Sequence, residues 1–244
     1  MEVSGELNFD IGWYDALWDL GGKVVSDPAS GTAENWVLVF RDGLRGMLAR
    51  IAEADDHYTE SLRLMRNPPS NPNEWAVLAD RHVAGVLFGM DSSVECFVFA
   101  LNALGSAKSP SDFRDLADAK DLRRVSPQDI LGPTSPADRD HPKPGYAKYF
   151  PRVQRFWIAN ESLLATIFQY HNVSKHRAAV VTGGDATTIY LRADPKNAGH
   201  GGSSSSHTLQ SISEAYQKFI NELLPITLQD GASVFGLTIS TRPR

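Results

Sequence analysis

The sequence contains a single cysteine, Cys96, among its 244 residues. One cysteine cannot form an internal disulfide, and it cannot build a zinc site that uses several thiolates. Near Met1 there is no basic segment followed by an apolar one, and no uninterrupted apolar run reaches about 18 residues. We therefore expect no secretory signal, no contact with a membrane and a cytoplasmic location.

An excess of positive charge is also lacking. The chain carries 24 Lys and Arg residues against 29 Asp and Glu residues, for a net charge of −5. This balance argues against broad non-specific binding to nucleic acid, which depends on neutralising phosphates, although it leaves room for a local basic patch. The hydrophobic share of 42% is typical of a soluble globular protein that forms its core without disulfides or metals.

Several catalytic motifs are missing. The sequence has no Gly-x₄-Gly-Lys-Ser/Thr phosphate loop and no Gly-x-Ser-x-Gly nucleophile elbow. It also has no Glu-x-x-His pair, which di-metal sites in helical bundles use. A carboxylate–histidine metal site could draw on Asp91, Glu95, His171 and His176. Without the Glu-x-x-His pairs, however, we predict neither a metal nor another cofactor.

Long amphipathic and apolar helices dominate what is present. Apolar residues recur at steps of three and four positions, which is the period of a helix buried on one face. The helices predicted in this way cover residues 33–66, 72–105, 151–176 and 208–225, and residues 13–25 form either a short helix or an irregular packing segment. The stretch from Cys96 to Leu101 is apolar on every side, which indicates a central, buried helix. We predict a mainly α fold, an antiparallel bundle of four to five long helices.

Local signals set the ends of these helices. Thr32, Asn71 followed by Pro72, and Thr208 have the residue types that cap a helix N-terminus. Pro225 is predicted to end the last helix, because proline lacks the backbone N–H that a helix needs.

We predict a single domain over residues 1–244. Residues 106–150 form an irregular, proline-rich excursion within it, with short helical starts at Ser109 and Ser126. Residues 178–193 contain two β-type runs around Gly183 and Gly184, which predicts a hairpin. Residues 234–240 are predicted to add a third strand, so that the bundle carries a small β appendage near its C-terminus.

Polar residues within the two most apolar helices mark a candidate site. Asn102 lies almost two turns after Glu95, and His176 lies one turn after Asn172. Burying such groups is costly unless they find partners, so we predict that Glu95, Asn102, Asn172 and His176 lie together. Lys175 and Arg177 flank this cluster and can supply positive charge.

The segment His171-Asn-Val-Ser-Lys-His176 resembles the motif of HEPN-type proteins, which are short helical bundles. Many of them are metal-independent ribonucleases of toxin and defence systems. Their motif has an Arg, usually followed by a polar residue such as Asn, and a His four to six residues after the Arg. Asn172 and His176 fit the second and third parts, while His171 stands in the place of the Arg. The resemblance covers residues 160–180 and the bundle architecture.

The resemblance implies that His176 acts as the acid–base group and that Asn172 positions it. It further implies that His171, Lys175 or Arg177 contacts phosphate. A strict Arg-x₆-His match also occurs from Arg50 to His57. It falls on an ordinary amphipathic helix, and we interpret it as part of a solvated face.

Two hypotheses remain open. In the first, the chain is a HEPN-like protein that acts on RNA or nucleotides, as a toxin- or defence-type ribonuclease or a degenerate relative of one. In the second, it is a non-catalytic helical interaction module that forms a homodimer. Its polar cluster then fixes the packing, with Glu95 paired to His176 or Lys175.

Overall fold

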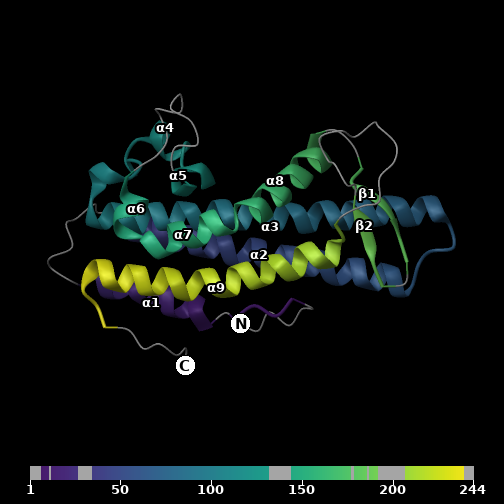
Figure 1. The fold of residues 1–244 in the computed structure, drawn as a ribbon, viewed down its shortest axis with the longest axis horizontal. Coiled ribbons are helices and arrows are strands. Elements are labelled where there is room, and N and C mark those ends of the chain that lie inside the picture. Colours follow the sequence, from purple (N-terminus) through teal and green to yellow (C-terminus); the bar gives the residue numbers. More distant parts are fainter. Residues whose placement is uncertain are drawn as a thin grey trace. The chain divides into compact units, whose positions relative to one another are not determined.

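The computed structural model describes residues 7–10, 12–26, 35–131, 144–176, 179–185, 187–191 and 207–238, and of residue 176 only the backbone. Most of these residues are helical (Figure 1). The longer helices are α1 (Gly12–Val25), α2 (Trp36–Arg66), α3 (Pro72–Lys108), α8 (Glu161–His176) and α9 (Leu209–Phe235). The shorter ones are η1 (Pro110–Asp112), α4 (Ala119–Leu122), α5 (Pro127–Leu131), α6 (Gly145–Tyr149) and α7 (Pro151–Ala159). The predicted mainly α fold is confirmed.

A small antiparallel hairpin is the β appendage. Strand β1 (Val181–Gly184) pairs with β2 (Ile189–Leu191), and a bulge lies between Val181 and Gly183. Asp80 of α3 anchors the hairpin, since its carboxylate accepts hydrogen bonds from the backbone N–H groups of Val180 and Val181 at 2.9 and 3.1 Å. The hairpin predicted within residues 178–193 is therefore present.

The chain forms two compact units, and the division between them falls within α2, α3 and α9. Unit 1 comprises Met1–Phe9, Ala49–Ser92 and Glu161–Phe219, and unit 2 comprises Asp10–Leu48, Ser93–Asn160 and Ile220–Arg244. The single domain predicted from the sequence stays a prediction.

The core of unit 1 is built by the second half of α2, the first half of α3, α8 and the first half of α9. Its buried side chains include Ile51, Tyr58, Leu87, Val173, Ile212 and Tyr216. Gly89 lets α2 and α3 approach closely, because a Cβ atom there would lie 2.7 Å from the backbone oxygen of Arg50. Close packing of the two helices therefore explains this glycine.

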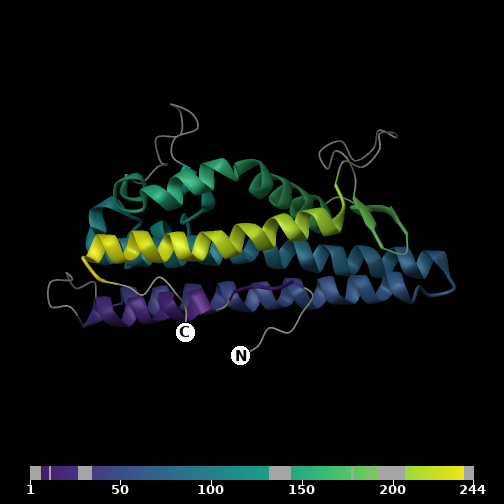
Figure 2. The same cartoon turned by 60° about the horizontal axis from the view of Figure 1, so that its bottom comes forward.

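The core of unit 2 is built by α1, the first half of α2, the second half of α3, α7 and the last turns of α9. Its buried side chains include Leu20, Phe40, Phe97, Leu104, Trp157 and Leu228. The rings of Phe97 and Trp157 stack at 5.8 Å. Helix α7 runs beside the end of α9 (Figure 2). Asp230 of α9 accepts hydrogen bonds from the first backbone N–H groups of α7.

Two predicted helix starts are confirmed by their caps. The side-chain oxygen of Asn71 accepts a hydrogen bond from Asn73 N at 3.0 Å, and α3 begins at Pro72. The hydroxyl of Thr208 accepts one from Ser211 N, also at 3.0 Å, and α9 begins at Leu209. The predicted cap Thr32 lies outside the described residues.

The predicted end of the last helix at Pro225 is wrong. Pro225 lies inside α9, which continues to Phe235. An interior proline removes one backbone hydrogen bond, at a cost of about 3 kcal/mol. Burial of Leu228 and Ala232 beyond the proline offsets that cost. Consequently Val234 and Phe235 are helical, and the strand predicted to begin at residue 234 is wrong there. Residues 239 and 240 of the predicted strand lie outside the described residues.

The helix predicted over residues 151–176 is interrupted at Asn160. The side-chain amide of Asn160 donates to Phe156 O at 2.8 Å, and this bond ends α7 before α8 begins. The excursion predicted over residues 106–150 contains only short helices, and η1 and α5 begin directly after Ser109 and Ser126.

Helix α3 is long and apolar enough, by length and composition, to cross a membrane. Within the fold, 61% of its most apolar stretch is buried.

Candidate functional site: an aspartate–histidine pair in unit 1

The carboxylate of Asp91 and the imidazole of His171 form a close pair in unit 1. Asp91 Oδ2 lies 2.7 Å from His171 Nδ1, and the two side chains are only 12% and 13% exposed. A carboxylate accepts hydrogen bonds and does not donate them, so the Nδ1–H group of His171 is the donor. In the neutral ring this fixes the tautomer and leaves Nε2 as a proton acceptor. Among the described residues, Nε2 has no hydrogen-bond partner.

The imidazole of His171 packs against an aromatic ring. The ring of Phe88, one turn before Asp91 on α3, meets His171 edge-on with a centroid distance of 5.5 Å. The guanidinium of Arg50 on α2 lies 5.1 Å from the centre of the same phenyl ring and pairs with Glu53. Phe88 of α3 thus contacts both Arg50 of α2 and His171 of α8.

Polar groups without partners follow His171 on α8. Asn172 is half-buried and Lys175 is exposed. Neither side chain has a hydrogen-bond or ion-pair partner within the part of the chain that the structure describes. Lys175 comes one helical turn after His171, so both project from nearly the same face. The side chain of His176 and the whole of Arg177 lie outside the described residues.

The predicted supporting residues Glu95 and Asn102 belong to unit 2, whereas Asn172 and the backbone of His176 belong to unit 1. Glu95 is exposed. Asn102 is fully buried and uses its amide inside unit 2, where it exchanges hydrogen bonds of 2.9 and 3.1 Å with the backbone of Arg114. The clustering of all four residues stays a prediction.

A second histidine pair was not predicted from the sequence. His57 of α2 and His82 of α3 face each other with their Nδ1 atoms 3.2 Å apart. Burial lowers the pKa of His82, and the neighbouring His57 lowers it further. His57 itself is half-buried against α3. The interpretation of His57 as part of a solvated face is therefore wrong. Gly85 leaves room for this pair, since a Cβ atom there would lie 2.2 Å from the His57 ring.

Of the four residues considered for a metal site, Asp91 and His171 come together. Within the described ranges, no group of three or more His, Cys, Asp or Glu side chains is placed to hold a metal ion. The chemistry that the Asp91–His171 pair can perform without a metal is proton transfer at Nε2.

Comparisons with protein-family models, with curated proteins and with solved structures find no match for this chain.

Proposed function

We propose that this chain is a HEPN-like protein that cleaves RNA without a metal, with His171 as its acid–base group. The observation that carries the proposal is the Asp91–His171 pair, in which Nδ1 is held and Nε2 has no partner among the described residues. A histidine oriented by a carboxylate is a recurrent arrangement for proton transfer at neutral pH.

In the proposed reaction, Nε2 of His171 acts as the base and, once protonated, as the acid. The 2′-oxygen of a ribose attacks the adjacent phosphorus, and the bond from phosphorus to the 5′-oxygen breaks. Nε2 of neutral His171 accepts the proton of the 2′-hydroxyl, or, once protonated, gives a proton to the leaving 5′-oxygen. Asp91 keeps the ring in the required tautomer and stabilises the imidazolium that forms. General acid–base catalysis of this kind contributes about 10²- to 10⁴-fold in rate.

Lys175 and Asn172 supply groups for the phosphate in this proposal. The ammonium of Lys175 has no partner within the described residues and lies one turn from His171. A lysine binds phosphate as a point charge, and an amide NH₂ adds a neutral donor. These side chains take the part that an Arg plays in the motif that the sequence resembles, where this chain has His171.

The proposal differs from the sequence-based assignment in one respect. The resemblance gave the acid–base role to His176 and a phosphate contact to His171. We assign the acid–base role to His171 because its Asp91 partner is placed to orient it. His176 is the alternative acid–base group, and both are tested in the same assay.

The test is cleavage of a single-stranded RNA in the presence of a chelator. We expect the wild type to produce 2′,3′-cyclic phosphate ends and H171A to lose about 10²- to 10⁴-fold in rate. H82Q is the matched control, because it removes a half-buried histidine of the same unit and leaves the Asp91–His171 pair intact. Equal rates for the wild type, H171A and H176A would end the nuclease hypothesis.

A second candidate function is a non-catalytic interaction module that forms a homodimer. The observation that favours it is Phe168, which is 52% exposed on α8, one turn before His171. Light scattering on the wild type and F168E tests this candidate. A dimer that becomes a monomer in F168E, together with equal RNA cleavage by the wild type and H171A, would establish the second function in place of the first.

A further inference from the structure

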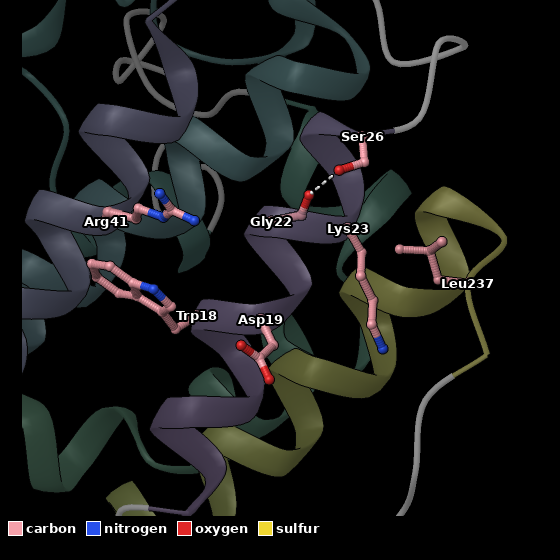
Figure 3. Close-up of a pocket in the computed structure, with 7 residues that line it drawn as sticks. All are labelled: Trp18, Asp19, Gly22, Lys23, Ser26, Arg41 and Leu237. Atoms are coloured by element: carbon pink, nitrogen blue, oxygen red, sulfur yellow. Dashed lines mark hydrogen bonds between the residues drawn. The ribbon is translucent and has the colours of Figure 1, made fainter.

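A pocket in unit 2 lies between α1, the start of α2 and the segment after α9. It has a volume of about 720 Å³, within the usual range for a small-molecule site. Trp18, Asp19 and Lys23 of α1 line it together with Arg41 of α2 (Figure 3). None of these residues belongs to the aspartate–histidine site of unit 1.

The guanidinium of Arg41 is the unusual feature of this pocket. It lies 4.8 Å from the centre of the Trp18 ring, which fixes its position by a cation–π contact. Its Nε atom is buried and has no hydrogen-bond partner, and within the described residues the side chain forms no ion pair. Arginine carries five N–H donors, and buried donors are nearly always satisfied. Because no described residue forms an ion pair with this guanidinium, its remaining N–H donors can serve a ligand.

Charge indicates what kind of acceptor would fit. Among the described residues that line the pocket, Lys23 and Arg41 are cations and Asp19 is the one carboxylate. Arg45 adds a third cation nearby, 5.0 Å from the Trp18 ring, although it also pairs with Asp42 at 3.6 Å. The local charge is positive on a chain whose net charge is −5. An anion is the ligand that this local charge favours.

We propose that this pocket binds a phosphate monoester of nucleotide size. The planar fork of a guanidinium matches the oxygens of a phosphate in a bidentate arrangement. Lys23 points away from Arg41 in Figure 3, so it adds positive charge to the pocket as a whole without sharing the same phosphate. The volume of 720 Å³ is larger than a bare phosphate, which leaves room for an organic part of the ligand. The proposal is independent of the proposed RNA cleavage.

Calorimetric titration with AMP, inorganic phosphate and adenosine tests this inference. We expect AMP to bind with an affinity that falls as salt rises, inorganic phosphate to bind more weakly and adenosine not to bind. R41M should abolish AMP binding, and R41K should weaken it, because lysine retains the charge but not the fork. R155M is the matched control, since Arg155 is an exposed arginine of the same unit that does not line the pocket.

The variant D19N is a second test, because misfolding cannot explain a gain in affinity. Asp19 is exposed, so its replacement should not disturb the core. Removing its negative charge should raise the affinity for AMP by about threefold. Failure of AMP and phosphate to bind the wild type, or equal AMP binding by the wild type and R41M, would overturn the proposal.

Discussion

The Nδ1 atoms of His57 and His82 lie 3.2 Å apart in unit 1, which is the distance of a hydrogen bond between two imidazole rings. One ring must donate and the other accept, so the pair shares a single proton between the two Nδ1 atoms. The ring centroids are 5.5 Å apart, and Gly85 leaves the space that the His57 ring occupies. Protonating both rings breaks this bond and places two positive charges side by side.

This pair should make stability depend on pH. The pKa of His82 is lowered from its ordinary value of 6.5, first by burial and then by His57, Arg81 and Arg63, while Glu60 opposes the change. A histidine with a lowered pKa in the folded state binds fewer protons there than in the unfolded chain. Its contribution to stability is therefore present above pH 6.5 and is lost as the pH falls below that value.

Urea unfolding between about pH 7.5 and pH 5 measures this effect. We expect the free energy of unfolding of the wild type to fall over this range and the slope to be smaller in H82Q. H207Q serves as the control, because His207 is a half-buried histidine of the same unit outside the pair. Identical slopes for the wild type and H82Q would show that the pKa of His82 is not lowered in the folded protein.

Gly89 should not tolerate a methyl group. Alanine favours a helix over glycine by about 1 kcal/mol, which would stabilise α3 if space allowed. A Cβ atom at position 89, however, would lie 2.7 Å from Arg50 O and 2.8 Å from Ala54 N, and backbone atoms cannot move aside cheaply. Overpacking of this kind costs about 1–3 kcal/mol, so we expect G89A to be destabilised in thermal unfolding.

Gly22 of α1 is the matched control for that substitution. A Cβ atom there would meet only Arg41 Nη2, at an ordinary contact distance of 3.7 Å. We expect G22A to be as stable as the wild type or more stable, by up to about 1 kcal/mol. A G89A variant as stable as G22A would contradict the close approach of α2 and α3.

The sequence predicted those features that depend on neighbouring residues. Asn71 and Thr208 could be identified as caps because a cap acts on residues two or three positions away. Pro225 misled the prediction because the packing of α9 beyond it decides the outcome, and a local rule does not contain that packing. Asn160 ends α7 through its own side chain, a signal that the strong apolar pattern around it obscured.

The candidate site, too, depends on tertiary packing that local sequence patterns do not contain. Asp91 and His171 could each be selected as polar residues in apolar helices, since burying such groups demands a partner. Their pairing could not be predicted, because spacing within one helix does not fix how two helices align. His57 and His82 escaped detection for this reason as well, as each looks like an ordinary residue of an amphipathic face.

The buried ion pair between Arg114 and Asp129 should hold the excursion after α3 in place. Arg114 Nη2 lies 2.9 Å from Asp129 Oδ1, with the two side chains 4% and 0% exposed. Asp121 also contacts this guanidinium at 3.1 Å. Removing one partner of a buried pair costs about 3–5 kcal/mol, because the other charge stays buried without compensation. We expect D129N to lose about 3 kcal/mol in urea unfolding, the lower end of that range, since Asp121 remains.

The exposed Asp115 provides the comparison for D129N. It accepts a hydrogen bond from Ala117 N at the surface. D115N should change stability by no more than about 0.5 kcal/mol. Similar losses in D115N and D129N would mean that the buried pair does not stabilise this segment.

Asp230 joins the end of α9 to the start of α7. Its Oδ2 atom accepts hydrogen bonds from Arg152 N at 2.8 Å and Val153 N at 3.0 Å, which satisfies two N–H groups that have no partner within the helix. Loss of a cap costs about 0.5–2 kcal/mol, so we expect D230A to be destabilised by that amount in urea unfolding. D230N keeps an oxygen acceptor and should lose less.

The pH dependence of D230N separates the cap from its charge. Burial raises the pKa of Asp230 above its ordinary value of 3.8, and the two backbone N–H groups and the nearby Arg152 and Arg155 only partly oppose this. A carboxyl with a raised pKa stabilises the fold fully below pH 3.8, and this contribution is lost as the pH rises through its folded-state value. Asparagine does not titrate, so the stability of the wild type relative to D230N should decline from acidic to neutral pH. A constant difference between the two proteins would show that burial does not impose the expected cost on this carboxylate.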